Sequence, residues 1–422
     1  MSDPLPGAAD PAPDLAGQAL RFCMVTSFYP PYNFGGDGIF VQQLALALAR
    51  RGHRVTVVHC IDAFYASGGR EPGPARLTHP NLEVISLRSV AGLLSPLYTQ
   101  QTARPGFKAR RLRDILGPGA FDVIHYHNVS LVGGAGVLAY GDAIKLYTTH
   151  EHWLLCPLST LWKFDRQPCD SRQCVRCTLH ARRPPQWWRY GGVLTRNLQH
   201  IDAFLAPSRF MIELHRRHGI EGRFELMPNF TAHTGAPDAR QPGAGRQRPY
   251  FLMAGRLERS KGFQRVIRAF REFTDADLLI AGSGAMEAEL RELAQGAAHI
   301  ELLGWTDGER LAQLYADARA VIVPSIWQEP FGLIVAESLV RGTPVIVNDM
   351  GALAELVGES AGGLVYQDEA QLLACAQRLL QDASYRDALG HAGRESAQRL
   401  WSEESHLARY LGLVKELRAT AR

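Results

Sequence analysis

Two glutamates, Glu329 and Glu337, lie eight residues apart in the segment EPFGLIVAE, between a strand-like run and a second apolar run. Two acids so close in sequence could serve as the catalytic pair of a glycosidase. The carboxyls of such a pair lie about 5–5.5 Å apart in retaining enzymes and about 6.5–9.5 Å apart in inverting ones. Eight residues of helix rise about 12 Å, so the spacing weakens the hydrolase hypothesis, although a folded Glu-Pro-Phe turn could shorten the separation.

The residues between the two acids favour a role in binding. A helix that begins near Phe331, Gly332 and Leu333 would offer free backbone N–H groups and the positive end of its dipole to an anion. Glu337 would lie about one turn inside this helix, where a carboxylate suits the two hydroxyls of a ribose. Glu329 would face whatever lies beyond the phosphates. The alternative is structural, with a loop acid followed by an acid that the helix dipole favours.

Cations and glycines follow two other strand-like runs in the second half of the chain. Arg256 and Lys261, in AGRLERSKGF, suit a diphosphate because arginine makes a forked contact and lysine acts as a point charge. In LLIAGSG the run ends in Gly282, Ser283 and Gly284, and glycine lets the backbone approach a ligand closely. Each feature alone also fits an ordinary solvated loop or turn.

The first half of the chain offers a glycine loop and two histidines. The loop NFGGDG contains Gly36 and Asp37, precedes a helical pattern and could direct backbone N–H groups into a cleft. It matches neither the G-x-G-x-x-G dinucleotide pattern nor a P-loop. His127 ends DVIHYH and could hydrogen-bond a sugar hydroxyl, although a lone histidine is more often structural. His150 and Ser208 also end strand-like runs, so we expect all three at one sheet edge.

Four of the seven cysteines gather in an insert at about 151–190. They are Cys156, Cys169, Cys174 and Cys177. In a reducing compartment such a cluster suggests a metal more than disulfides. The last two have the C-x-x-C spacing of a zinc knuckle, and the first two could complete a tetrahedron. The long first gap weakens this pattern, so a structural zinc and unliganded thiols both stay open.

Alternating apolar and polar runs predict the elements that must position these residues. Residues 20–30, 39–52 and 53–60 read as strand, helix and strand, which implies a parallel sheet with a right-handed crossover. Further strands are expected at 82–87, 121–127, 144–150 and 201–208, and a second series at 249–255, 276–284, 299–305, 320–325, 344–349 and 362–366.

The two series of strands predict an α/β chain with two doubly wound, Rossmann-like domains that face a central cleft. The first domain is expected at 20–230, and 231–248, rich in Gly, Pro and Ala, reads as a linker. The second domain is expected at 249–400, followed by a final helix at 401–422. Since the carboxyl ends of parallel strands line the ligand crevice, the candidate residues of both halves would meet in the cleft.

Positive charge is concentrated in the first half of the chain. The formal net charge is only +4, but residues 1–228 carry 25 Lys and Arg against 17 Asp and Glu. The stretches 104–113 and 181–190 interleave cations with aromatic residues. Such stretches could face an anionic membrane surface or nucleic acid, or form a solvated face. No nucleic-acid-binding motif supports the second option.

The chain shows no sign of a membrane span or a secretory signal. No apolar run reaches the length of about 18 residues that a spanning helix needs. Residues 1–19 are rich in Pro, Ala and Asp and lack the basic start and apolar core of a signal peptide. We therefore expect a disordered tail and a cytoplasmic protein.

Together the motifs resemble the retaining glycosyltransferases of family four (group 1), which have the GT-B fold. The resemblance covers about residues 20–420, and its most specific element is the E-x7-E motif from Glu329 to Glu337. The segments GGDG, DVIHYH, APSRF, MPNF, GRLERSKG and GSG all occur in the order of this family. The final helix matches the segment that crosses back to the first domain in this fold.

The resemblance implies a role for each candidate residue. Arg256 and Lys261 would hold the donor diphosphate, Glu337 the ribose, and Glu329 and His127 the donor sugar. The other donor-binding positions would be Gly36, Gly282, Ser283, Gly284, Phe331, Gly332 and Leu333, and the acceptor side would include Asp37 and His150. The family uses a nucleotide sugar, needs no catalytic metal ion and keeps the anomeric configuration.

The same resemblance implies a glycan or a lipid-linked acceptor, in the synthesis of a surface polysaccharide or glycolipid, with the basic domain facing an anionic membrane. No nucleic-acid partner is expected. One alternative is a nucleotide-sugar epimerase or a phosphorylase on a similar scaffold. A phosphorylase would need a pyridoxal lysine, and Lys261, one of only five lysines, is already assigned. Another alternative is a non-catalytic scaffold or zinc-knuckle binding protein.

Overall fold

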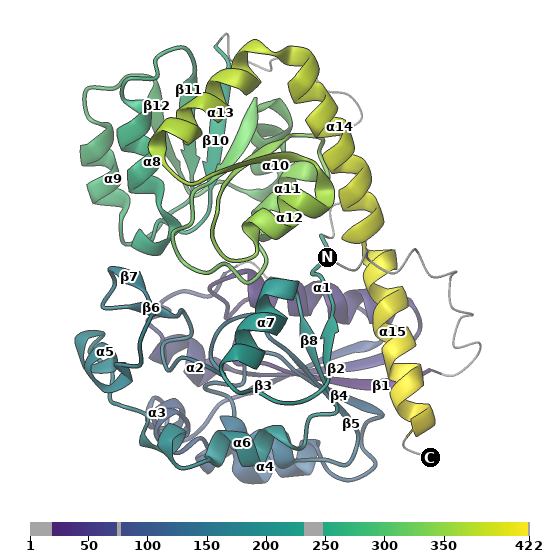
Figure 1. The fold of residues 1–422 in the computed structure, drawn as a ribbon. Coiled ribbons are helices and arrows are strands. Elements are labelled where there is room, and N and C mark those ends of the chain that lie inside the picture. The colour runs from purple at the N-terminus through teal and green to yellow at the C-terminus, as the bar shows by residue number, and fades with distance from the viewer. Residues whose placement is uncertain (1–18, 74–76, 232–247, 421–422) are drawn as a thin grey trace.

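The computed structural model describes residues 19–73, 77–231 and 248–420. The chain forms two α/β domains, one above the other, with a pair of long C-terminal helices along one side (Figure 1). Within the described residues, no helix has the length and hydrophobicity that crossing a membrane requires. The predicted N-terminal tail and linker fall almost entirely outside these residues.

The first domain is built on a seven-stranded parallel sheet. Its strand order is β3-β2-β1-β4-β5-β8-β9. The bounds are β1 Arg21–Val25, β2 Arg54–Cys60, β3 Leu82–Leu87, β4 Val123–Tyr126, β5 Ile144–Thr148, β8 Ala203–Ala206 and β9 Phe224–Leu226. In the register, Val25 of β1 lies opposite both Val58 and Tyr126. The central strands are buried on both faces, which explains why they read as continuous apolar runs.

Helices cover both faces of the first sheet. They are α1 Gly36–Arg50, α2 Ile61–Ala66, α3 Leu94–Thr102, α4 Ala109–Ile115, α6 Val193–Leu198 and α7 Arg209–Arg217, with short 3-10 turns η1 Gly106–Lys108, η2 Ala135–Ala139 and η3 Trp187–Tyr190. The cysteine-rich insert follows β5. It contains the hairpin β6 Trp162–Lys163 and β7 Gln167–Pro168 and the helix α5 Cys174–His180.

The second domain repeats the architecture with six parallel strands in the order β12-β11-β10-β13-β14-β15. These are β10 Tyr250–Ala254, β11 Asp277–Ala281, β12 Ile300–Gly304, β13 Ala320–Val323, β14 Val345–Asn348 and β15 Gly363–Tyr366. The intervening helices are η4 Arg259–Lys261, α8 Phe263–Phe270, α9 Glu287–Ala294, α10 Gly308–Asp317, α11 Leu333–Leu339, α12 Leu353–Ser360 and α13 Glu369–Gln381.

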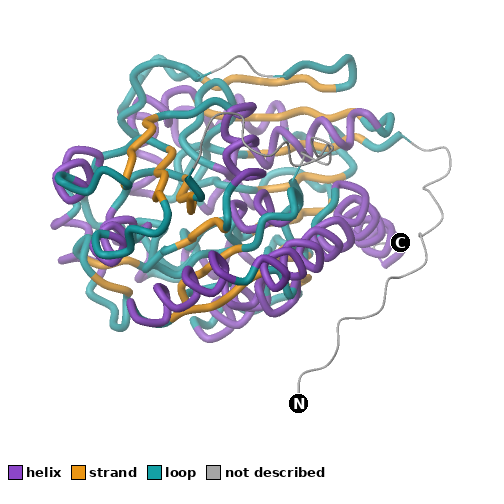
Figure 2. The backbone as a smooth tube through the Cα atoms, turned by 90° about the horizontal axis from the view of Figure 1, so that it is seen from above, coloured by secondary structure: helices purple, strands orange, loops and turns teal. Residues whose placement is uncertain are grey.

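The chain then returns to the first domain. Helix α14 (Ala383–Leu400) lies beside the second domain and α15 (Glu403–Thr420) beside the first, as Figure 1 shows. The view from above places the end of α15 at the periphery of the molecule (Figure 2). Leu407, Tyr410 and Val414 of α15 are fully buried in the core of the first domain. The predicted two-domain α/β architecture with a returning C-terminal helix is therefore confirmed.

Every predicted strand is present, although several are shorter than expected. The run at 201–208, for example, forms a strand only at Ala203–Ala206, because Ser208 already caps α7 by accepting a hydrogen bond from the Met211 N–H. The short strand β9 and the β6–β7 hairpin were not predicted. Their two or three residues are too few to show a periodic pattern.

Candidate active site

The two domains meet at the segment just before α11. His152, which follows β5, donates from Nε2 to the Gln328 carbonyl oxygen at 2.7 Å. The Ser208 hydroxyl donates to the Pro330 carbonyl oxygen, also at 2.7 Å. Both partners flank Glu329 in sequence. Residues from the first domain therefore hold the backbone of the E-x7-E motif from both sides, at the carboxyl edge of both sheets.

Lys261 and Glu329 form the central ion pair of this region. The lysine Nζ lies 2.5 Å from the glutamate Oε1, and the Ser325 hydroxyl donates to the same oxygen at 2.7 Å. The lysine also lies over the ring of Trp327, 4.9 Å from its centroid. Burial would raise the pKa of Glu329, but Lys261 and Ser325 outweigh it and hold the pKa below its ordinary value. The carboxyl is therefore ionised at neutral pH.

Two glycines give Glu329 its position. Gly351 has φ +65°, and a Cβ there would lie 2.3 Å from the backbone nitrogen of Glu329. The next residue, Ala352, donates its N–H to the Glu329 carbonyl at 2.9 Å. Gly332, at the start of α11, has φ +97°, a conformation that favours glycine. Gly332 thus allows an unusual turn after Glu329, and Gly351 allows its own backbone to lie close to the Glu329 backbone.

Glu337 occupies a separate position on α11. Its carboxylate accepts a hydrogen bond from the Tyr315 hydroxyl at 3.1 Å. Burial raises its pKa above the ordinary value, against the opposing effects of Tyr315 and Arg341. Glu337 therefore has its own partner, whereas Glu329 is neutralised by Lys261. This separation fits two binding roles better than the acid and base of a hydrolase.

The remaining predicted donor residues of the second domain lie along the ends of β10 and β11. Arg256 is half exposed, and its guanidinium lies 2.6 Å from Glu258. The Ser283 carbonyl accepts a hydrogen bond from the backbone of Leu257. Gly282 has φ +142°, and a Cβ there would clash with the Gly255 carbonyl. Since Ser283 and Gly284 are exposed, this turn could contact a ligand.

The glycine loop of the first domain faces α11. A Cβ added at Gly36 would lie only 2.9 Å from Cδ1 of Leu333. Both residues were predicted to bind the donor from opposite domains, and the structure brings them together. Asp37, the next residue, accepts hydrogen bonds from the Gly38 N–H at 2.9 Å and from Asn128 at 3.4 Å. Burial raises its pKa.

His127 and His150, which follow β4 and β5, form a hydrogen-bonded pair. Nδ1 of His127 lies 2.8 Å from Nε2 of His150. Burial, and then the neighbouring histidines, lower the pKa of His127 well below its ordinary value, and that of His150 to about 3. Both imidazoles are therefore uncharged at neutral pH. Nε2 of His127 is buried and has no hydrogen-bond partner among the described residues, so it can receive a ligand hydroxyl.

Glu151 is a candidate that the sequence interpretation missed. It lies between His150 and His152, and its Oε2 atom is buried without a hydrogen-bond partner in the described part of the chain. Burial, with a smaller contribution from the nearby Asp37 carboxylate, raises its pKa to about 8. The available signal was the acid itself, enclosed by two histidines in an apolar context.

The four clustered cysteines line one small cavity of about 20 Å³ in the insert, beside Trp162 and Lys163. All four thiols are free. In the described residues, no set of three or more His, Cys, Asp or Glu side chains has the geometry of a metal site. The four thiols are therefore neighbours, but they are not arranged as the ligands of one metal ion. The structural zinc stays a prediction.

Comparison with known proteins agrees with this architecture. The GT-B glycosyltransferases share its fold, among them sucrose-phosphate synthase from Thermosynechococcus elongatus, with a TM-score of 0.73 and 23% identity over 96% of this chain and 100% of that one. A protein from Anabaena, solved in complex with UDP and glucose, gives a TM-score of 0.64 at 15% identity over 94% of this chain and all of the other.

Sequence families give the same result. Residues 34–234 match the family described as Glycosyltransferase Family 4, and residues 237–396 match Glycosyl transferases group 1. Glycogen synthase of Mycobacterium tuberculosis is 27% identical over 91% of each chain. The chain belongs to the group 1 glycosyltransferases of family 4.

Proposed function

We propose that the protein transfers a sugar from a nucleotide-sugar donor to a glycan or lipid-linked acceptor, with retention of configuration and without a catalytic metal ion. The observation that carries this proposal is the Lys261–Glu329 pair, held at the domain junction. In this pair the lysine can bind a diphosphate, and the ionised carboxylate next to it can accept hydrogen bonds from sugar hydroxyls.

The other predicted residues extend this arrangement along a donor. Glu337, about one turn inside α11, would accept hydrogen bonds from the ribose hydroxyls. Arg256 would leave its exposed partner Glu258 and join Lys261 on the diphosphate, because a pair exposed to water is weak. Nε2 of the neutral His127 would bind a hydroxyl of the transferred sugar. The UDP and glucose held by the structurally similar Anabaena protein are consistent with a donor of this class.

In the proposed reaction, the bond between the anomeric carbon and the diphosphate oxygen breaks while the acceptor oxygen bonds to the same face of that carbon. The acceptor proton passes to the departing phosphate oxygen. Lys261 and Arg256 stabilise the negative charge that develops on the diphosphate, which is the main contribution of the protein. Domain closure would exclude water from the site.

Release of nucleoside diphosphate from UDP-, GDP- and ADP-linked sugars tests this proposal, with EDTA present and water standing in for the acceptor. We expect slow release from one nucleotide class, and NMR should show that the first free sugar keeps the anomeric configuration of the donor. Glu329→Gln should slow the release strongly. An inverted sugar, or activity that EDTA abolishes, would overturn the mechanism, and an epimerised nucleotide sugar without diphosphate release would indicate an epimerase.

A further inference from the structure

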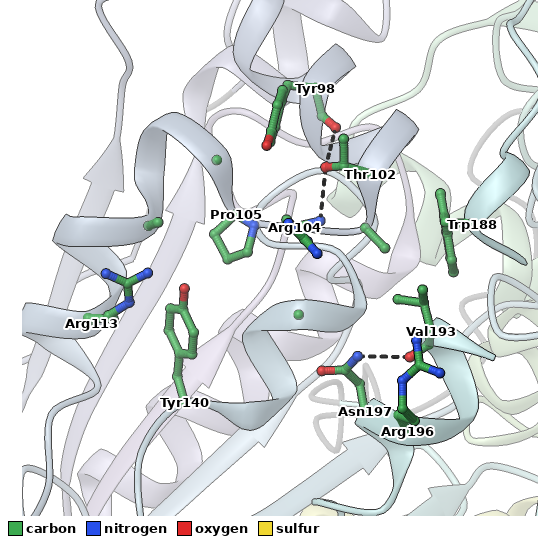
Figure 3. Close-up of a pocket in the computed structure, with 14 residues that line it drawn as sticks. Tyr98, Thr102, Arg104, Pro105, Arg113, Tyr140, Trp188, Val193, Arg196 and Asn197 are labelled. Carbon is green, nitrogen blue, oxygen red and sulfur yellow. Dashed lines mark hydrogen bonds between the residues drawn. The ribbon is translucent and has the colours of Figure 1, made fainter. Parts of the chain in front are cut away.

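A cavity of about 790 Å³ lies in the first domain, among residues that the proposed mechanism does not use. Its walls come from α3, η1 and α4 on one side and from η2, η3 and α6 on the other (Figure 3). Figure 1 places α4 and α6 at the end of the first domain that lies away from the second domain. The volume is within the range of small-molecule sites, about 300–1,000 Å³, so the cavity can hold a ligand of its own.

Three arginines line this cavity without acidic partners. Arg104, Arg113 and Arg196 are exposed, and no ion pair to any of them occurs in the described residues. No Asp or Glu is among the cavity's described lining residues. In Figure 3 the side chain of Arg104 lies between the other two. The positive charges are thus spread along the cavity, which suits a ligand with several anionic groups better than a single small ion.

The cavity also offers neutral hydrogen-bonding groups. The side-chain amide nitrogen of Asn197 donates to the Val193 carbonyl at 2.8 Å, which leaves the amide oxygen as an acceptor. The hydroxyls of Tyr98 and Tyr140 make no hydrogen bond to any other residue in the described part of the chain. Such groups beside positive charges suit a ligand that carries hydroxyls as well as anionic groups.

Aromatic rings add flat apolar surfaces to the cavity and its surroundings. Tyr98, Tyr140 and Trp188 line the cavity. Trp187 and Tyr190, in the same 3-10 turn as Trp188, are 64% and 65% exposed. A sugar ring can pack its C–H face on an aromatic side chain while its hydroxyls form hydrogen bonds at the edge, since such side chains combine an apolar body with a polar tip. The rings therefore favour a carbohydrate as the ligand.

We propose that this cavity binds an acidic oligosaccharide, whose sugar units carry carboxylate groups. The arginines would pair with the carboxylates, the amide and hydroxyl groups with sugar hydroxyls, and the aromatic rings with the faces of the sugars. A single-stranded nucleic acid also combines anionic groups with flat rings, but the chain belongs to a glycosyltransferase family, which favours a glycan. The inference rests on the proposed function in that the bound segment would belong to the acceptor, held at a distance from the end that receives the sugar.

The proposal is tested by isothermal titration of the full chain at low salt, with no donor present. The probes are tetramers of galacturonate, mannuronate and sialic acid, each compared with its methyl ester, which keeps the sugar rings and removes the charge. We expect the wild type to bind at least one acid form and not its ester, with an affinity that falls as salt is added. An exposed ion pair contributes up to about fivefold in affinity. The triple variant Arg104→Glu, Arg113→Glu, Arg196→Glu should therefore lose at least about tenfold.

A matched control reverses three exposed arginines of the second domain, with Arg265→Glu, Arg310→Glu and Arg399→Glu. This variant has the same net charge as the first triple variant and should keep most of the binding. Trp187→Ala with Tyr190→Ala should weaken the binding without any change in charge. Equal loss in both triple variants, or unchanged binding in the first triple variant and the double variant, would overturn the proposal.

Other ligands distinguish the remaining outcomes. Binding of none of the three acid tetramers, or equal binding of the methyl esters or of a hexaglutamate peptide, would overturn the proposal. Preferred binding of a single-stranded polynucleotide, or of vesicles that contain phosphatidylglycerol, would also overturn it and would assign the cavity to nucleic acid or lipid.

Release of nucleoside diphosphate from the donor is measured on the same protein. If an acid tetramer binds and no donor is turned over, the cavity assignment stands and the proposed transfer fails. If the donor is turned over and no tetramer binds, only the cavity assignment fails.

Discussion

At the scale of single residues, the site depends on contacts that link distant parts of the sequence. Arg256, Lys261 and the two glutamates could be selected as candidates because their types and positions suit a nucleotide sugar. Their partners could not be predicted. Nothing in the sequence indicates that Lys261 pairs with Glu329, 68 residues away, since that contact depends on how two loops meet.

Glu151 gives a prediction at this scale. With a folded-state pKa of about 8 against an ordinary 4.5, the carboxyl stays protonated in the folded chain while the unfolded chain has lost the proton. Between these values the folded state binds more protons, so stability falls as pH rises. Glu151→Gln removes this dependence. The melting temperature of the variant should therefore rise relative to the wild type from about pH 5 to about pH 8.

An exposed glutamate on α10 supplies the control for this measurement. Glu309→Gln makes the same change of side chain at a position exposed to solvent, so it is the matched control for the loss of one carboxyl. If the difference in melting temperature between Glu151→Gln and the wild type does not change with pH, Glu151 is not a buried, protonated acid.

At the scale of elements, the apolar patterns gave reliable strands but poor boundaries. Both parallel sheets could be predicted because their strands are buried on both faces and read as continuous apolar runs. The final helix, expected at 401–422, is α15 from Glu403, and residues 401–402 separate it from α14. Trp401, at this break, has a buried ring that packs against Phe331 with centroids 5.8 Å apart. Such a tertiary contact leaves no periodic signal.

The cysteine-rich insert carries the prediction at this scale. Since Cys156, Cys169, Cys174 and Cys177 line one cavity, small side-chain movements could bring four thiolates around a tetrahedral ion. We expect protein purified without chelator to hold one zinc ion per chain by elemental analysis. Cys174→Ser should lower this content sharply, whereas Cys375→Ser, outside the insert, should not. If the purified wild-type protein contains no zinc, the insert is a cluster of reduced thiols without a metal.

At the scale of the whole molecule, the returning helix α15 connects the second domain to the candidate site of the first domain. The Tyr410 hydroxyl of α15 lies 3.1 Å from Nδ1 of His125, whose ring contacts that of His127, with centroids 3.9 Å apart. The helix that leaves the second domain therefore supports the candidate site of the first.

The central claim is that Lys261 binds the diphosphate of a nucleotide donor in this cleft. Isothermal titration with UDP, GDP and ADP in turn, with EDTA present, tests it most directly. We predict that the wild type binds at least one of them. Loss of a charge-assisted hydrogen bond in Lys261→Ala should weaken that binding about ten- to a hundredfold, while Lys415→Ala, an exposed lysine of α15, should leave it unchanged. Equal binding by Lys261→Ala and the wild type, or no binding of any of the three, would contradict the claim.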